Sequence, residues 1–283
     1  MNNKNPVINI FLCSMLFCVS TVHAETIDQL IDKAVAGKHR DPAFVARDQY
    51  RHPGETLKFF GLEPDMTVVE ITPGKGWYTE ILAPVLRNDG ILYAAGFAMT
   101  AKSTPDWQKE MQIEFANKLM QHPDVYDHVV VTELAPPERM TIAPPGTADM
   151  ILTFRNVHNW IKAGNIQAMF EIFYRTLKPG GVLGIVEHRA PVNTPVDQMI
   201  KSGYVTEEFV IQMAEAIGFK FEESSEINAN SADTKDHPEG VWTLPPTLRL
   251  CGKLDNGASK DECIKKYTAI GESDRMTLRF RKP

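Results

Sequence analysis

The sequence predicts a fold of the α/β class, with a parallel sheet covered by helices on both faces. From residue 67 onward, short apolar segments rich in β-branched residues alternate with longer segments of helical periodicity, as parallel strands and their crossover helices do. The 283 residues, of which 43% are hydrophobic and 23% charged, suffice for one domain with a sizeable core and some additions.

Before the first strand, residues 25–61 predict a helical N-terminal extension. The stretch "TIDQLIDKAVA" places Ile27, Leu30, Ile31 and Val35 on one helical face. The stretch that follows, "RDPAFVARDQYRHPGETLKFFG", is divided by prolines and ends in glycine. We therefore expect several short helices rather than a continuous one.

Strands and helices then alternate in order. We expect strands in "TVVEI", "GILYAAGF", "HVVVTEL", "ADMILTF" and "VLGIVEH", because each is short and apolar. We expect helices in "WYTEILAPVLR", kinked at Pro84, and in "TPDWQKEMQIEFANKLMQH", "NIQAMFEIFYRTLKPGG" and "TEEFVIQMAEAIGF". The alternating stretches "FKFEESSEI" and "MTLRFRK" predict two half-buried strands near the end.

Charge and composition exclude some classes of partner. The net charge is −6 and the isoelectric point about 5.8, and no basic stripe interrupts the sequence. We therefore expect binding neither to nucleic acid nor to an anionic membrane surface. A small-molecule substrate is the expected partner.

The first 24 residues have the composition of an export signal. Lys4 precedes the apolar run "VINIFLCSMLFCVSTV", residues 7–22, and "VHA" follows it, which matches a signal peptide cleaved after Ala24. The run is short for a membrane span, which needs about 20 apolar residues. We expect a signal peptide over residues 1–24, a periplasmic or secreted protein and no stable membrane span after cleavage. An uncleaved anchor is the alternative.

The two remaining cysteines, Cys251 and Cys263, lie in a loop-rich insertion that we place at residues 228–274. Two lone cysteines in an oxidising compartment predict a disulfide, which would stabilise the fold by about 3 kcal/mol on the chain-entropy model. Two unrelated thiols are the alternative. Neither cysteines nor histidines have the pair spacing of a metal site, so no metal is expected. A long insertion is typical of a lid or a binding loop.

The turn after the first strand, "VVEITPGKGWYTE", is the leading candidate for a ligand site, because such sheets bind ligands beyond the carboxyl ends of their strands. Gly74 and Gly76 permit positive φ angles and close approach of a ligand to the backbone. The turn follows a strand that carries an acid and precedes a helix. This context favours a dinucleotide- or nucleoside-type site over a plain turn.

Three stretches resemble motifs of the class I S-adenosylmethionine-dependent methyltransferases: "VVEITPGKGWYTEILAP", "ADMILTFRNVHNW" and "LKPGGVLGIVEHRAP". Within them, "RNV" and "LKPGG" are similar to the ubiquinone and menaquinone C-methyltransferases. Together with "YRHPGETLKFFGLEPD" and "ESDRMTLRFRKP", they resemble a group of exported predicted methyltransferases. The resemblance covers about residues 40–227 and the last ten. It implies a Rossmann-like, seven-stranded sheet with an antiparallel last strand, within a methyltransferase-like domain over residues 62–283.

The resemblance also implies S-adenosylmethionine as cofactor, with the glycine loop at its methionine end. The expected cofactor-binding residues are Glu70, Thr72, Pro73, Gly74, Gly76, Tyr78, Glu133, Arg155 and Asn156. Two features depart from the family pattern. Thr72 replaces the first glycine, and the second strand ends at Gly96 and Phe97 without the acid that usually pairs with the ribose hydroxyls. Either another group fills that role or the ligand is a different one.

Methyl transfer from a sulfonium needs alignment and desolvation, and a base only where the acceptor must lose a proton. His158 and Glu187 are the candidate catalytic residues; purely structural roles are the alternative for both. Glu187 and its neighbour His188 should point to opposite faces of a strand, which argues against a metal pair. Arg51, before the sheet, would close over the pocket or belong to a solvated turn.

From these features we expect an S-adenosylmethionine-dependent methyltransferase of a small or envelope-associated acceptor. Two alternatives stay open. One is a non-catalytic periplasmic protein that binds another metabolite, and the other is an enzyme of a different reaction class that uses the same cleft.

Overall fold

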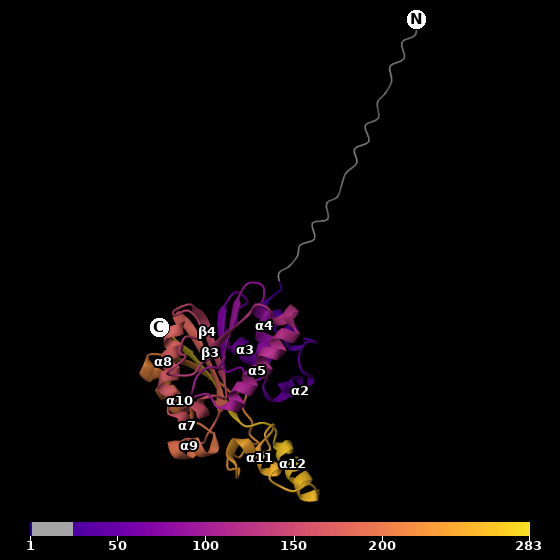
Figure 1. Ribbon diagram of the computed structural model, residues 1–283, viewed down its shortest axis with the longest axis vertical. Helices are drawn as coiled ribbons and strands as arrows, with labels where there is room; N and C mark the ends of the chain where they lie inside the picture. Colours follow the sequence, from indigo (N-terminus) through magenta and orange to yellow (C-terminus); the bar gives the residue numbers. More distant parts are fainter. Residues whose placement is uncertain (2–24) are drawn as a thin grey trace.

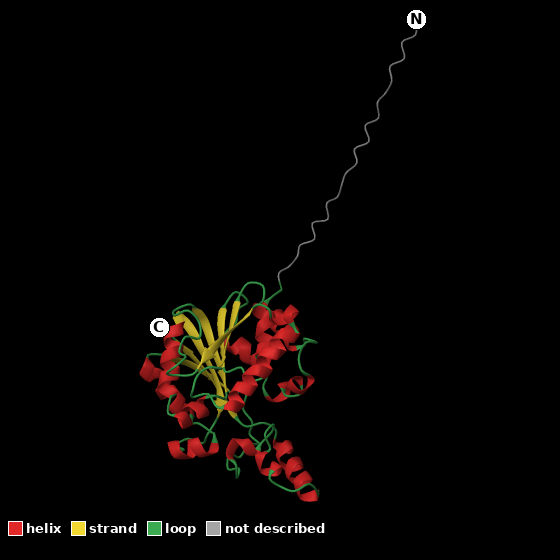
Figure 2. Cartoon of the chain, in the orientation of Figure 1, coloured by secondary structure: helices red, strands yellow, loops and turns green. Residues whose placement is uncertain are grey.

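The computed structural model describes Met1 and residues 25–283, so the predicted signal peptide lies outside the described residues apart from Met1. The described part contains a seven-stranded sheet with the strand order β3-β2-β1-β4-β5-β7-β6 (Figures 1 and 2). Its strands are β1 (Thr67–Ile71), β2 (Ile91–Phe97), β3 (Val129–Leu134), β4 (Ala148–Phe154), β5 (Leu177–His188), β6 (Lys220–Ser225) and β7 (Arg275–Arg281).

Strands β1 to β5 pair in parallel, and β7 lies antiparallel between β5 and β6. The expected Rossmann-like sheet with an antiparallel last strand is therefore confirmed. The strand order reverses at β1, where Val69 pairs with Tyr93 of β2 on one side and Ile151 of β4 on the other. This reversal is the switch point at which open α/β sheets place their ligands.

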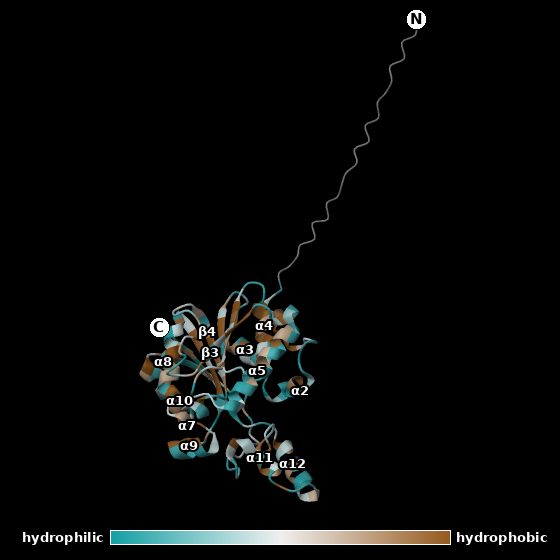
Figure 3. Ribbon diagram, in the orientation of Figure 1, coloured by the Kyte–Doolittle hydropathy of each residue, from teal (hydrophilic) through white to brown (hydrophobic). Residues whose placement is uncertain are grey.

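Helices cover both faces of the sheet, because successive strand side chains point to opposite sides. Val69 and Ile71 contribute to the core on one face, under α7 (Val157–Ala163), α8 (Ile166–Thr176) and α10 (Glu207–Ile217). Val68 contributes to the core on the other face, under α1 (Ile27–Val35), α3 (Pro53–Phe60) and α4 (Thr79–Leu86). In Figure 3 the strands are largely brown and the outer helices carry much teal, as buried strands and half-exposed helices require.

The N-terminal extension is built into this second core. It comprises α1, α2 (Pro42–Val45), the 3-10 helix η1 (Asp48–Tyr50) and α3, so the expectation of several short helices is met. Thr26 and Gln29 form a capping box at the start of α1. Phe60 of α3 packs directly on β5, where a Cβ built on Gly184 would lie 2.9 Å from the Phe60 ring.

The remaining helices of the sheet domain are α5 (Asp106–Gln121), α6 (Pro123–Tyr126) and α9 (Val196–Ser202). Pro84 lies inside α4, as expected. None of the helices in the described part of the chain is long and apolar enough to cross a membrane.

The insertion of residues 228–274, expected to be loop-rich, contains η2 (Gly240–Thr243), α11 (Arg249–Gly252) and α12 (Ala258–Ile270). In α12 Tyr267 is buried, and Cys263, Ile264 and Ile270 pack partly buried in the same small core. The helix therefore has a short apolar stripe, which the expectation of a loop-rich insertion overlooked. Cys251 and Cys263 form the expected disulfide, which joins α11 to α12. Figure 1 shows α11 and α12, in orange to yellow, at the end of the molecule away from the C-terminus.

Candidate functional site

The loop after β1 has the backbone conformation that its glycines predict. The φ angles of Thr72, Gly74 and Gly76 are 50°, 61° and 84°. The Thr72 N–H donates to the Ala95 carbonyl, and the Gly76 N–H donates to the Pro73 carbonyl, which closes the turn. A left-handed conformation at the non-glycine Thr72 costs free energy, and such strain is typical of functional loops.

Side chains of α5 lie directly in front of these glycines. A Cβ built on Gly74 would lie 3.7 Å from Met111 Sδ, and one on Gly96 only 2.1 Å from Gln112 Oε1. The same Gln112 oxygen accepts a hydrogen bond of 3.0 Å from the Phe97 N–H. Gln112 therefore occupies the end of β2, where the family pattern has an acid. No sequence pattern identifies Gln112, because a buried glutamine within a helical stretch has no motif of its own.

Glu70, expected at the methionine end of the cofactor, is buried at the end of β1. Its carboxylate accepts a hydrogen bond of 2.6 Å from Thr79 Oγ1. Burial raises the pKa of Glu70 to about 7, although the Thr79 hydrogen bond and the charge of Lys118 oppose this shift. The carboxyl group beside the loop therefore titrates near neutrality.

Two other expected contacts are part of the protein framework. Tyr78 is buried and stacks on Phe154 with 3.5 Å between ring centroids, and burial raises the pKa of its hydroxyl to about 12. Asn156 donates from Nδ2 to the Ile71 carbonyl and to Thr153 Oγ1, both at 3.1 Å. Asn156 thus ties the mouth of β4 to the start of the glycine loop.

Glu133, the expected adenine contact, lies at the end of β3 beside the neighbouring loop. It accepts hydrogen bonds from the Met99 N–H at 2.9 Å and from Arg139 Nε at 3.1 Å. Its carboxylate holds two surface segments together and borders a shallow cavity with Arg139.

A cavity of about 310 Å³ opens at the mouths of β4 and β5, beneath the insertion. Residues of the extension, of the strand ends and of the insertion meet around this cavity. Its walls are formed by Arg47, Arg51, Arg155, His158, His188, Val241, Trp242, Pro245, Pro246, Thr247, Glu272, Ser273 and Arg275. The structure thus brings the expected residues Arg155 and His158 together with Arg51, which closes over this cavity.

His158 and Glu187, the candidate catalytic residues, are in contact at the cavity wall. The fully buried Glu187 carboxylate accepts hydrogen bonds from His158 Nδ1 at 3.0 Å and from the His158 and His188 N–H groups. This contact assigns the Nδ1 proton and leaves Nε2 of a neutral His158 as an acceptor. The pair has the arrangement of a base oriented by a carboxylate.

His188 stands beside this pair, with its ring centroid 5.3 Å from that of His158. Its Nδ1 lies 2.5 Å from Ser273 Oγ. Burial, followed by the charges of His158 and Arg275, holds the pKa of His188 well below its usual value. One possible ligand atom from each of His158, Glu187 and His188 lies within 4.8 Å of the others, so the expectation that Glu187 and His188 would lie apart is wrong for their polar atoms. The arginines of the same cavity make its surroundings unfavourable for a cation.

The arginines of the cavity converge on one carboxylate. Glu272 accepts from Arg47 Nε at 2.6 Å and from Arg51 Nε at 3.0 Å, and it also pairs with Arg275. Burial alone would raise the pKa of Glu272, but the neighbouring guanidinium groups hold it well below the usual range. No sequence pattern identifies Glu272 and Arg275 as members of this site, because they lie more than 200 positions from Arg51 in the chain.

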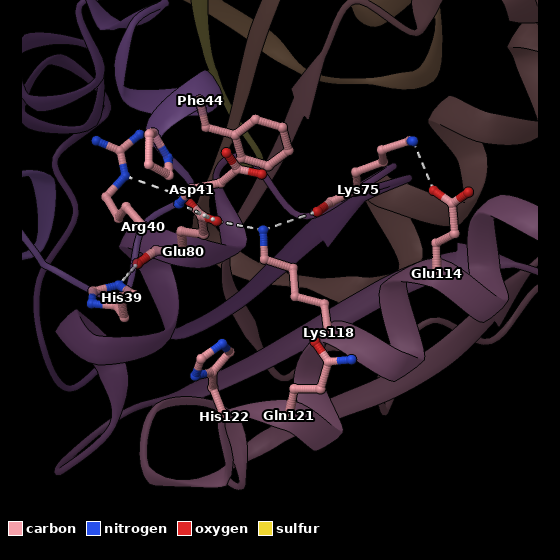
Figure 4. Close-up of a pocket in the computed structure, with 11 residues that line it drawn as sticks. His39, Arg40, Asp41, Phe44, Lys75, Glu80, Glu114, Lys118, Gln121 and His122 are labelled. Atoms are coloured by element: carbon pink, nitrogen blue, oxygen red, sulfur yellow. Dashed lines mark hydrogen bonds and ion pairs between the residues drawn. The ribbon is translucent and has the colours of Figure 1, made fainter.

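A larger cavity, of about 450 Å³, lies between the extension, Lys75 of the loop after β1, α4 and α5 (Figure 4). Its charged groups are mostly paired with one another. Glu80, in the centre of Figure 4, lies 3.5 Å from Arg40 Nε and also pairs with Lys118, while Lys75 pairs with Glu114 at 2.8 Å. This network fastens the extension to the domain, so we regard the smaller cavity at the strand ends as the better candidate site.

Comparison with known proteins finds similarity in structure but not in sequence. No protein-family model matches the chain, and no curated protein matches it. The structure is similar to an S-adenosylmethionine-dependent methyltransferase from Aquifex aeolicus, with a TM-score of 0.51 and 22% identity over 66% of this chain and 88% of that chain.

Two further structures show the range of proteins with this fold. The cyclase SpnF has a TM-score of 0.54 and 15% identity, over 93% of this chain and 99% of that one. A geranyl diphosphate C-methyltransferase from Streptomyces coelicolor, in complex with Mg²⁺, geranyl diphosphate and S-adenosyl-L-homocysteine, has a TM-score of 0.50 and 14% identity over 88% and 87% of the two chains. The chain therefore has the fold of the S-adenosylmethionine-dependent methyltransferases.

Proposed function

We propose that the chain is an S-adenosylmethionine-dependent methyltransferase that acts on a small or envelope-associated acceptor. The observation that carries this proposal is the loop after β1, where Gly74 and Gly76 adopt left-handed φ angles at the switch point of a methyltransferase-type sheet. When bound, the cofactor supplies an electrophilic methyl group on a sulfonium sulfur.

Binding of the cofactor at this loop would require two side chains in front of it to change rotamer. Met111 and Gln112 approach the glycines with the far ends of long, flexible side chains, which can rotate without a backbone shift. Gln112 would then offer its amide to the ribose hydroxyls in place of the absent acid, and Glu133 would face the adenine. The residues proposed for the methionine end are Glu70, Thr72, Pro73, Gly74 and Gly76.

His158 is the proposed general base. Glu187 holds the Nδ1 proton of His158, so Nε2 can take a proton from an acceptor hydroxyl or amine as that group gains the methyl. The cavity adjoins the loop after β1, because the guanidinium group of Arg51, which lines the cavity, lies 4.8 Å from the ring centroid of Trp77, the residue after Gly76. A base in this cavity is thus near the proposed methyl donor.

Calorimetry with the purified chain tests the proposal. We expect S-adenosylmethionine or S-adenosylhomocysteine to bind with a Kd below about 100 μM, and Gly74→Val to weaken binding at least about tenfold, because a side chain at this φ strains the loop. Gly146→Val is the matched control, since Gly146 also has a positive φ of 71° but has nothing within 4 Å. Absence of heat with both compounds would remove the methyltransferase proposal and leave the alternatives of another metabolite or another reaction class.

We also propose that the protein acts in the periplasm or outside the cell, on the basis of the signal-like residues 1–24 and the Cys251–Cys263 disulfide. Mass spectrometry of protein recovered from cells and alkylated without reductant should show a chain that begins at Glu25 and carries the intact bridge. Two alkylated cysteines, at 251 and 263, would contradict export.

A further inference from the structure

The cavity at the mouths of β4 and β5 contains an excess of positive charge. Four guanidinium groups line it, those of Arg47, Arg51, Arg155 and Arg275, but Glu272 is the single carboxylate in its wall. Two of these side chains are almost fully buried, with exposed fractions of 4% for Arg51 and 2% for Arg275. Buried charges of one sign are costly unless a counter-charge compensates them.

Two of the cavity's arginines have donors without acceptors. In the part of the chain that the structure describes, the Arg155 guanidinium has no hydrogen-bond or ion-pair partner, and Arg275 Nε is buried without an acceptor. Burial, followed by the charge of Arg275, lowers the pKa of Arg155 to about 10. The φ angle of Arg155 is 61°, so its position also costs backbone strain. Strain and unpaired donors in one cavity point to a ligand that compensates for both.

Arg189, which is half-buried, shows a different balance of charge. Arg189 pairs with Glu207 at 3.1 Å, Glu226 at 2.6 Å and Asp274 at 2.9 Å, and these contacts raise its pKa. Three carboxylates thus surround one arginine at Arg189, whereas in the cavity four arginines share one glutamate. The missing negative charge is therefore specific to this place.

The insertion adds apolar and aromatic side chains to the wall of the cavity. Val241, Trp242, Pro245 and Pro246 of the insertion line it, and the Trp242 ring packs edge-on against His158 at 5.9 Å. A ligand that fills about 310 Å³ would thus place an anionic group among the arginines and an apolar body against Trp242.

We propose that this cavity binds a small organic oxyanion, a phosphate monoester or a carboxylate with an apolar or aromatic body. Arginine is suited to this role because its planar fork donates two parallel hydrogen bonds to such groups. The proposal that the cavity binds an anion does not depend on methyl transfer. The further proposal that this anion is the methyl acceptor, bound beside Nε2 of His158, rests on the proposed function.

Calorimetry with phenyl phosphate, benzoate, inorganic phosphate and phenol tests the site in the purified chain. We expect phenyl phosphate or benzoate to bind and inorganic phosphate to bind more weakly than phenyl phosphate, because it lacks the apolar body. Phenol should give no measurable heat. Phenol binding as tight as that of phenyl phosphate, or no binding of any of the three anions, would overturn the assignment.

The decisive variant is Arg155→Gln, which breaks no hydrogen bond or ion pair of the described residues and should therefore fold. We expect it to weaken binding of the better anion by about 10- to 100-fold, as for the loss of a charge-assisted hydrogen bond. Arg281→Gln is the charge-matched control at the far end of β7, where Arg281 pairs with Glu222, and it should leave binding unchanged. Equal binding by Arg155→Gln and the unaltered chain, or equal loss in both variants, would contradict the site.

The same preparations separate this inference from the proposed function. Anion binding without S-adenosylmethionine binding would retain the oxyanion site and remove methyl transfer. Cofactor binding with no anion binding, tested with and without S-adenosylhomocysteine, would remove the oxyanion site alone.

Discussion

Glu70 shows how one residue can couple the loop after β1 to pH. Its carboxyl is 2% exposed and has a pKa of about 7, raised chiefly by burial. Between the ordinary value of 4.5 and about 7, the folded protein holds a proton that the unfolded chain releases. Stability from this group is therefore complete below pH 4.5 and is lost as the pH rises to about 7.

Glu70→Gln should remove this dependence, because glutamine keeps an acceptor for Thr79 and does not ionise. We expect the free energy of unfolding of the variant to rise relative to the unaltered chain by about 3 kcal/mol between pH 4.5 and pH 8. Urea denaturation at a series of pH values measures this difference. A difference that stays constant with pH would show that Glu70 titrates normally.

The free energy of unfolding of the variant has to be compared with that of the unaltered chain at each pH, because other buried groups change stability with pH in the opposite direction. The pKa of His188 is held below its ordinary 6.5 by burial and neighbouring charges, so the unfolded chain takes up a proton that the folded protein does not. His188 therefore costs stability as the pH falls below 6.5. This contribution is common to both chains and cancels in the difference.

At the scale of the elements, α4 and the extension are joined by one buried carboxylate. Glu80 of α4 is 0% exposed and pairs with Arg40 and Lys118. It also accepts a hydrogen bond of 3.1 Å from the Asp41 N–H. Removal of such a charge leaves the buried Arg40 guanidinium with Asp48 as its remaining ion-pair partner, beside its hydrogen bond to the Val35 carbonyl.

We expect Glu80→Gln to lower the free energy of unfolding by about 3 kcal/mol, since it breaks a buried ion pair on one side. Glu114→Gln is the control from the same cavity, because the pair of Glu114 with Lys75 is more than half exposed on both sides. The control should cost less than about 1 kcal/mol. Similar losses in the two variants, measured by urea denaturation, would show that Glu80 does not fasten the extension.

The elements differ in how far their sequence predicts them. In α5 the spacing of Met111, Phe115 and Leu119 predicts the helix, but Trp107, on the same stripe, is 56% exposed. The polar Gln112 is buried instead, against the end of β2. Periodicity identifies a helix from its apolar side chains, and it cannot identify a polar residue that is buried because a backbone N–H needs an acceptor.

At the scale of the whole molecule, the sequence predicts the fold better than it predicts the site. Local sequence patterns predict the strands and helices, whereas the site depends on contacts between residues far apart in the chain. Strand and helix segments follow from patterns within a few residues, whereas the strand order and the antiparallel β7 rested on the resemblance to a family. The contact between His158 and Glu187 can be expected from the sequence, because the two residues lie at or just beyond the ends of the neighbouring strands β4 and β5. The arginine cavity does not, because its members come from the extension, from β4 and from β7, and no local pattern relates them.

The meeting of Arg51 and Glu272 across 221 positions has a consequence for biosynthesis. A chain that leaves a ribosome or a translocation channel with its N-terminus first presents its two early arginines long before their counter-charge emerges. Closing so long a loop is slow and comes late in folding. The cavity thus becomes competent only once the last strand is in place, and any ligand that stabilises it acts on the finished protein rather than on the nascent chain.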